Sequence, residues 1–193
     1  MNIIKRLIIV LEQQALNTYN GYERDKPILM LKSYVRNFVM LNRAITNRQQ
    51  KIYRGEIYWC DLGENIGCEE CKCRPAVIIQ NQKGNDNSPT TIIAPITNAT
   101  ITLPVAIKIN REIGSPITGT IDLGQIRVVS KGRLYRKIDK LTTSEQKAVD
   151  KALMLSVGLY KYVVDKQNDS HKIVELTREL NDYKQIVKEL SEK

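Results

Sequence analysis

Seven short β-prone runs, separated by turn residues, occupy the middle of this 193-residue chain and limit its fold most strongly. The runs are rich in Ile, Val, Thr and Tyr, a composition typical of β-strands. Glycine, asparagine, proline and serine fill most of the gaps, which predicts short turns and loops. Strands spaced in this way predict a small β-barrel or sandwich. The predicted strands are residues 56–62, 76–81, 91–97, 105–109, 119–123, 125–130 and 134–138.

Helical patterns precede the β region. Apolar residues recur at helical spacing near the N-terminus and again in residues 28–45, and Asn20-Gly21 separates the two stretches. Pro27 suits the first turn of the second helix. We therefore predict an α+β chain with three parts: a helical hairpin over residues 1–50, a β domain over 53–160 and a C-terminal amphipathic helix over 161–193. Arginines 36, 43 and 48 are expected on the polar side of the hairpin.

The segment after the strands is also helical. Thr143 is the predicted N-cap of a helix of about four turns, which Gly158 would weaken. Beyond it, apolar residues alternate spacings of three and four, as in the a/d seam of a coiled coil. A seam this short is marginal by itself, so we expect it to pack on a second copy or on the hairpin. A helix that caps the barrel is the alternative. The seam residues are Ile173, Leu176, Leu180, Tyr183, Val187 and Leu190.

The charge of the chain is basic and unevenly distributed. The net charge is +9, and residues 1–52 hold nine Lys and Arg against three acidic residues. A basic balance favours a polyanionic partner such as nucleic acid, although a lysine-rich surface alone produces the same balance. The aliphatic run Leu7–Leu11 is too short to span a bilayer or to serve as a secretory signal. We expect a cytoplasmic protein without membrane contact, in which the cysteines are reduced.

Three of the four cysteines crowd into GCEECKCRP, residues 67–75. Cys68 and Cys71 form one C-x₂-C pair, with Cys73 two residues further and Cys60 as the remaining candidate ligand. Structural zinc sites commonly use two such pairs, so the spacing is irregular for zinc. A redox-sensitive loop and cysteines without a special role are the other interpretations. We favour the last and expect a mobile loop that ends at a functional arginine; zinc at one equivalent per chain, lost on Cys71→Ser, would contradict this.

Five segments of the β region, in this order and spacing, resemble the MazF/PemK family of toxin ribonucleases from bacterial toxin–antitoxin pairs. They are RGEIY (54–58), the cysteine loop and strand to QN (67–81), GN and SPT leading to IT (84–97), QIR (125–127), and AL followed by SVGL (152–159). The chain departs from the family pattern at Gly124, where Glu is usual. The resemblance covers a little over half of the chain and leaves both helical extensions unexplained.

The resemblance implies a small, partly closed β-barrel of the MazF/PemK (CcdB-like) toxin type that forms a homodimer. It implies a metal-independent endoribonuclease without cofactors, which cleaves single-stranded RNA at short sequences. The expected partners are RNA and a cognate antitoxin, with DNA reached only through an antitoxin complex. Arg74 and Thr97 fall on the two catalytic positions of the family. We further predict RNA contacts at Gln125, Arg127, Asn81, Ser88 and Lys72.

The residue inventory agrees with this chemistry. Metal-free RNA cleavage can use the 2′-OH of the substrate as the nucleophile. The sole histidine, His171, lies in the C-terminal tail, so one chain cannot supply a two-histidine acid–base pair. The carboxylates of the β region show no close pairing typical of a two-metal site. Electrostatic stabilisation by arginine remains, and Arg74 fits because Pro75 biases its backbone towards an extended conformation.

Two other functions are compatible with the sequence. One branch of the barrel family poisons DNA gyrase by binding it and lacks the Arg/Thr pair, whereas this chain has Arg74 and Thr97. A degenerate toxin could instead use its basic hairpin to bind nucleic acid while the barrel only dimerises. Because residues 1–50 carry most of the net charge, we also expect them to modulate the access of substrate or partner.

Overall fold

All seven predicted strands are present in the computed structural model of the chain, which describes residues 6, 9–10, 13, 26–109, 111 and 115–191. They form a single sheet in which every pairing is antiparallel. The strands are β1 (Glu56–Asp61), β2 (Cys73–Ile78), β3 (Thr90–Thr97), β4 (Ala106–Ile109), β5 (Gly119–Asp122), β6 (Arg127–Ser130) and β7 (Leu134–Lys140).

Strand β3 lies at the centre of the sheet. The strand order is β4-β5-β3-β2-β1-β7, and β6 also pairs with β3. The first half of β3 pairs with β6, and its last two residues pair with β5. One long strand thus belongs to two diverging sheet portions, which curves the sheet. No pairing among the described residues joins β7 to β4 or β6, so the barrel is only partly closed, as expected.

Both faces of the sheet are buried. One core cluster includes Ile57, Val77 and Ile121 and continues to Val149 and Ala152 of the helix that covers this face. A second cluster lies on the opposite face and includes Ile52, Tyr58, Cys60, Ile78 and Leu134. Neighbouring residues of one strand therefore enter different cores, as the alternation of side chains in a strand requires. Burial of both faces explains why the strands are nearly continuous apolar runs.

Helix α4 (Thr143–Ser156) covers the first core cluster. Its N-cap is Thr142, one residue before the predicted cap, and Thr142 and Glu145 form a capping box. The helix ends where Gly158 adopts a φ of +73°, a conformation that suits glycine. The chain then continues directly into α5 (Tyr160–Ser191). Short helices connect the strands: α3 (Gln82–Asn87), η2 (Leu123–Gln125) and η3 (Lys131–Arg133).

Helix α2 (Lys26–Thr46) confirms the second helix of the predicted hairpin, whereas the first helix falls largely outside the described residues. The side of α2 that faces the barrel is mixed: Ser33 and Met40 are buried on it, and two arginines hold it to the barrel. Arg36 pairs with Asp61, and the Arg43 guanidinium donates to the Leu134 carbonyl at 2.8 Å. These two arginines therefore bind the barrel rather than standing free, a difference from the expected polar surface.

The apolar side of α2 faces outward. Its exposed apolar residues include Tyr34, Phe38, Leu41 and Ile45, with Phe38 60% exposed. Globular proteins usually turn such a stripe inward. Here Gly132 approaches the backbone of Ala44 so closely that a Cβ at position 132 would clash with it, so this part of α2 contacts the barrel backbone to backbone.

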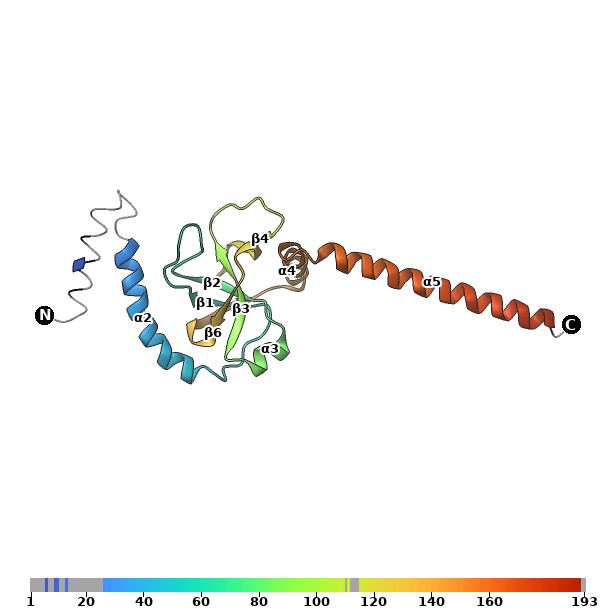
Figure 1. Cartoon of the computed structure of the whole chain (residues 1–193), viewed down its shortest axis with the longest axis horizontal. Coiled ribbons are helices and arrows are strands. Elements are labelled where there is room, and N and C mark those ends of the chain that lie inside the picture. Colours follow the sequence, from blue (N-terminus) through green and yellow to red (C-terminus); the bar gives the residue numbers. More distant parts are fainter. Residues whose placement is uncertain are drawn as a thin grey trace.

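Helix α5 extends away from the barrel as one long helix (Figure 1). Every residue from 165 to 185 is exposed, so the predicted alternative of a helix capping the barrel is wrong. Among the described residues, no helix is both long enough and apolar enough to cross a bilayer.

We expect Glu145→Gln to lower the free energy of unfolding by about 1–3 kcal/mol at pH 7. The Arg111 guanidinium binds the Glu145 carboxylate at 2.8 and 3.1 Å and, with the Thr142 N–H, holds its pKa below the ordinary 4.5 despite burial. A lowered carboxyl pKa stabilises the fold above pH 4.5, and this contribution is lost as the pH falls through the folded-state pKa.

Urea unfolding of both proteins between pH 7 and pH 3 measures the difference. Asp150→Asn is the control, because its pair with Arg54 is more exposed and should matter less. An equal cost of Glu145→Gln at pH 3 and pH 7 would contradict this assignment.

Candidate functional site

Arg74 and Thr97 line one groove, although they are 23 positions apart in the sequence. The β2–β3 register explains this. Ile78 pairs with Ile93, Val77 with Ala94 and Ala76 with Pro95, so continuing the register sets Arg74 opposite Thr97. The groove has a volume of about 380 Å³. We call it the Arg74 groove; it is lined by Trp59, Cys73, Arg74, Pro75, Ile96, Thr97, Asn98, Ala99 and Thr118.

The Arg74 guanidinium is held in place by the loop before it. Its Nε donates to the Cys71 carbonyl at 2.8 Å, and its Nη1 forms an ion pair with the Glu70 carboxylate. Burial lowers the pKa of Arg74, while the Glu70 carboxylate favours the charged form. The guanidinium therefore remains a cation, suited to stabilise negative charge rather than to act as a base.

Thr97 ends β3 and contributes a hydroxyl to the groove. Its Oγ1 accepts from the Ala99 N–H at 3.4 Å, and its Cα partner is Thr120 of β5. Because that one long contact engages the oxygen as an acceptor, the hydroxyl hydrogen is available to a ligand oxygen. Asn98 follows directly and adds an amide to the lining. The groove thus combines one cation with neutral hydrogen-bonding groups.

The β1–β2 loop, residues 62–72, closes on itself beside this groove. Lys72 donates its N–H to the Gly63 carbonyl at 2.6 Å and accepts at its own carbonyl from the Leu62 N–H at 2.9 Å. It does so with a φ of 65°, a left-handed conformation uncommon for a residue other than glycine. Its side chain is exposed at the base of the loop, two residues before Arg74.

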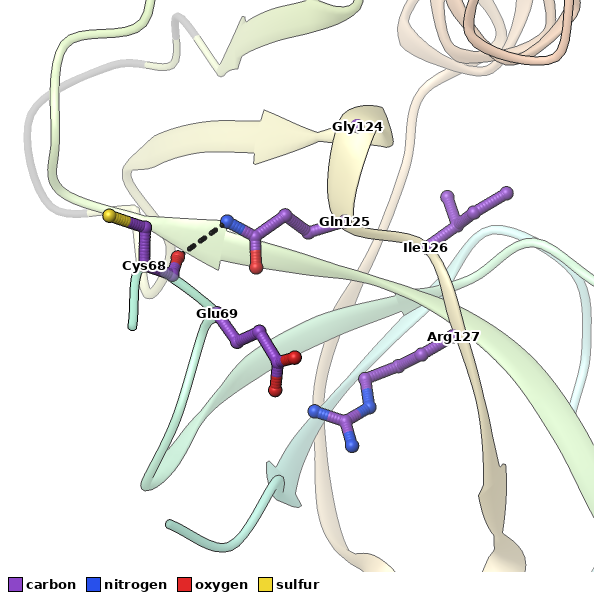
Figure 2. A pocket seen from close by; sticks show the side chains of 6 residues that line it. All are labelled: Cys68, Glu69, Gly124, Gln125, Ile126 and Arg127. Carbon is purple, nitrogen blue, oxygen red and sulfur yellow. Dashed lines mark hydrogen bonds between the residues drawn. The ribbon is translucent and has the colours of Figure 1, made fainter. Parts of the chain in front are cut away.

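Gln125 clamps the tip of the same loop. Its side-chain oxygen accepts from the Glu70 N–H at 2.5 Å, and its Nε2 donates to the Cys68 carbonyl at 2.9 Å (Figure 2). Gln125 lies in η2 and not in the strand predicted for 125–130, which begins only at Arg127. Gln125 thereby affects the position of Arg74 indirectly. It holds the backbone of Glu70, and the Glu70 carboxylate is the ion-pair partner of Arg74.

A second groove of about 560 Å³ lies between this loop and β6. Glu69 and Arg127 extend their side chains into it from opposite sides (Figure 2). We call it the Gln125 groove; its lining is Cys68, Glu69, Gly124, Gln125, Ile126 and Arg127. The structure therefore brings the predicted residues Gln125 and Arg127 together beside the loop that leads to Arg74.

Asn81 and Ser88 lie at the other end of the β2–β3 ladder. Asn81 is seven positions after Arg74: β2 carries the chain about 13 Å from Arg74 to Ile78, and Asn81 follows beyond the end of the strand. The Asn81 side chain caps α3 by accepting from the Gly84 N–H at 2.8 Å, and the Ser88 hydroxyl contacts that of Thr90 at 2.8 Å. Both side chains thus have local structural partners, and the structure does not bring them to the Arg74 groove.

The cysteines show no metal-binding arrangement within the described residues, where no three His, Cys, Asp or Glu side chains are grouped as ligands. All four are free thiols. Cys60 is fully buried in the second core cluster, and burial raises its pKa to about 12. Burial also raises the pKa of Cys73, which lines the Arg74 groove. Neither of these two thiols is poised as a reactive thiolate.

The aromatic residues near the site have different environments. Tyr58 is buried in the core, and its hydroxyl donates to Glu56 at 2.9 Å. Burial and this carboxylate raise its pKa. Tyr53 is 49% exposed, and Trp59 borders the Arg74 groove. Of these three aromatic residues, Trp59 is the one that borders the candidate site.

We expect Gln125→Ala to accelerate hydrogen exchange at the Glu70 amide by about threefold to tenfold, because this amide loses its acceptor. Mass spectrometry of peptides covering residues 66–72 measures the rate. Gln80→Ala removes a glutamine near the far end of the ladder and should leave these peptides unchanged. Equal exchange in Gln125→Ala and the unmodified protein would show that the clamp does not hold the loop.

Comparison with known proteins places the barrel in a family. A family model described as "PemK-like, MazF-like toxin of type II toxin-antitoxin system" matches residues 53–157. A protein of Bacillus subtilis (strain 168) named Endoribonuclease EndoA is 37% identical over 114 residues, which are 58% of this chain and 98% of that protein.

Solved structures share the fold over the same region. An endoribonuclease in complex with its cognate antitoxin, from mycobacterial species, has a TM-score of 0.50 at 23% identity and covers 56% of this chain and 97% of its own. MazF from Deinococcus radiodurans also has a TM-score of 0.50, at 17% identity, and covers 55% of this chain and 96% of its own. Because the family model spans more than half of the residues, the chain belongs to the PemK-like, MazF-like toxin family of type II toxin–antitoxin systems.

Proposed function

We propose that this chain is the endoribonuclease toxin of a toxin–antitoxin pair and that it cleaves single-stranded RNA at the Arg74 groove. The observation that carries the proposal is the placement of one guanidinium and one hydroxyl in a single groove of a MazF-like barrel. The identity with a protein named as an endoribonuclease supports the reaction class.

The reaction that fits these groups needs no metal ion. The ribose 2′-OH loses its proton to solvent and attacks the adjacent phosphorus, the bond to the 5′-oxygen of the next nucleotide breaks, and that oxygen takes up a proton from solvent. The products carry a 2′,3′-cyclic phosphate and a 5′-OH. Arg74 stabilises the additional negative charge on the phosphorane, and Thr97 donates a hydrogen bond to one of its oxygens. Trp59 offers a ring for stacking a base next to the cleaved bond.

The RNA path extends from the Arg74 groove along the β1–β2 loop into the Gln125 groove. Arg127 supplies positive charge there, and Gln125 supplies amide groups that can read a base once the loop moves. Lys72, exposed at the base of the loop, contributes a further phosphate contact. Asn81 and Ser88 remain weaker candidates for RNA contact, because their side chains are engaged at the far end of the ladder.

The partners follow from the same assignment. The barrel acts as a homodimer in the cytoplasm, an antitoxin protein inhibits it, and DNA is bound only by the antitoxin complex. The gyrase-binding alternative is less favoured, because the proposed catalytic residues Arg74 and Thr97 are both present and share one groove. Unchanged RNA together with capture of gyrase would favour that alternative. Salt-dependent RNA binding without turnover would favour the degenerate toxin.

We expect Arg74→Ala to reduce RNA cleavage by a factor of about 100 to 1,000, because Arg74 is the one cation among the described residues that line the groove. The assay contains excess EDTA, and the unmodified protein should remain active in it. Sequencing the 5′ ends of the fragments identifies the cleaved motif. Equal cleavage by both proteins would indicate a contaminating nuclease, and loss of activity in EDTA would contradict the metal-independent reaction.

Glu70→Gln should tighten binding of a single-stranded oligonucleotide that lacks the 2′-OH. The Glu70 carboxylate competes with a phosphate for the Arg74 guanidinium, so its removal frees the cation. We expect the Kd to fall about threefold relative to Glu69→Gln, which removes the same charge from the neighbouring position. A fall in kcat for RNA with no change in Kd would instead assign proton transfer to Glu70.

A further inference from the structure

From residue 165 to residue 185, helix α5 is exposed and lacks the tertiary packing that usually stabilises a helix. It has 32 residues and is therefore about 48 Å long, and residues 165–185 are all exposed. Helical stability in proteins comes mostly from packing of an apolar face, and isolated polar helices are marginal in water. A helix of this length thus needs a partner for most of its outer part.

One side of α5 carries the seam of a two-stranded coiled coil. Ile173, Leu176, Leu180 and Tyr183 lie on it, with exposures of 63%, 53%, 53% and 67%. Their spacing assigns Ile173 and Leu180 to heptad position a, and Leu176 and Tyr183 to position d. The register continues along the helix to Val187 at a and Leu190 at d.

The residue types at these positions select a particular assembly. Two of the three a positions are β-branched, Ile173 and Val187, and two of the three d positions are leucine, Leu176 and Leu190. β-Branched residues at a with leucine at d favour parallel dimers over higher oligomers. The occupant that this seam fits is a second α5 running in the same direction.

The charges beside the seam fit the same arrangement. Glu179 occupies position g, and Lys184 occupies position e of the following heptad. In a parallel pair, position g of one helix meets position e of the following heptad in the partner. Glu179 of each copy therefore faces the partner's Lys184, which gives two such pairs. Five residues apart, the two side chains do not meet on one helix. Within the described part of the chain, neither forms a salt bridge.

We propose that residues 173–190 form a parallel, two-stranded coiled coil with a second copy of this chain. The seam begins at Ile173 because Lys166 and Asp169 occupy the preceding a and d positions. Dimerisation of the barrels raises the effective concentration of the two helices, which stabilises a coil of this short length. The coil in turn holds two barrels at the same end of the assembly. This inference does not depend on RNA cleavage by the barrel.

Disulfide cross-linking in the full chain tests the arrangement. The background is Arg74→Ala, which removes the proposed toxicity, with Cys68, Cys71 and Cys73 changed to serine. Ile173→Cys and Tyr183→Cys should each give mainly disulfide-linked dimers on mild oxidation, whereas Arg178→Cys, at the outward position f, should not. In an antiparallel pair, a residue meets the same residue of the partner at only one height along the coil. Positions 173 and 183 are about 15 Å apart along the helix, so an antiparallel pair could cross-link at only one of them.

A charge reversal tests the partner and the direction independently. Glu179→Lys should lower the cross-linked fraction of the Tyr183→Cys protein about threefold or more, because two attractive pairs become repulsive. Adding Lys184→Glu should restore it. Absence of cross-linking at position 173 or 183, equal cross-linking at 178, or no rescue by the second reversal would each overturn the proposal and leave the seam to an antitoxin or another partner.

Discussion

The antiparallel register between β2 and β3 is the constraint on which the candidate site depends. Each paired residue of β2 fixes its partner on β3, and the ladder ends at Ala76 and Pro95. Pro75 and Pro95 lack an N–H for further ladder bonds, so the strands stop pairing where the groove begins. Arg74 and Thr97 then lie opposite each other in the groove at this end of the ladder. A shift of register by one residue would send one of the two side chains to the other face.

The β1–β2 loop controls how this site presents its charge. Glu70 neutralises the guanidinium that a phosphate would need, and Gln125 holds Glu70 through its backbone N–H. In the proposed reaction, the RNA phosphate would therefore displace this carboxylate to reach Arg74. Because the ligand phosphate would replace the Glu70 carboxylate, its affinity would depend on the charges that the loop carries. The barrel thus positions Arg74 and Thr97, and the β1–β2 loop, which has few buried apolar contacts, supplies the carboxylate that pairs with Arg74.

Much of this architecture could be predicted from local patterns. The β-prone composition of the runs and the turn residues between them located all seven strands, and the Pro75 ring together with the family motif identified Arg74 as the candidate functional residue. The ion pair with Glu70 was missed because a loop has no periodicity that reports which side chains meet. Gln125 was assigned to a strand, since η2 is too short to show a helical pattern. The exposed apolar stripe of α2 was also unexpected, because amphipathic helices usually bury such a stripe.

A double-mutant cycle tests the central claim that Arg74 and Thr97 act on one phosphate in one groove. The variants Arg74→Lys, Thr97→Val and the combination of both are compared by their kcat/KM on the identified RNA motif. If both side chains contact the same transition state, the double variant should lose clearly less activity than the product of the two single losses. Strictly multiplicative losses would contradict the account, because they would mean that the two residues act independently.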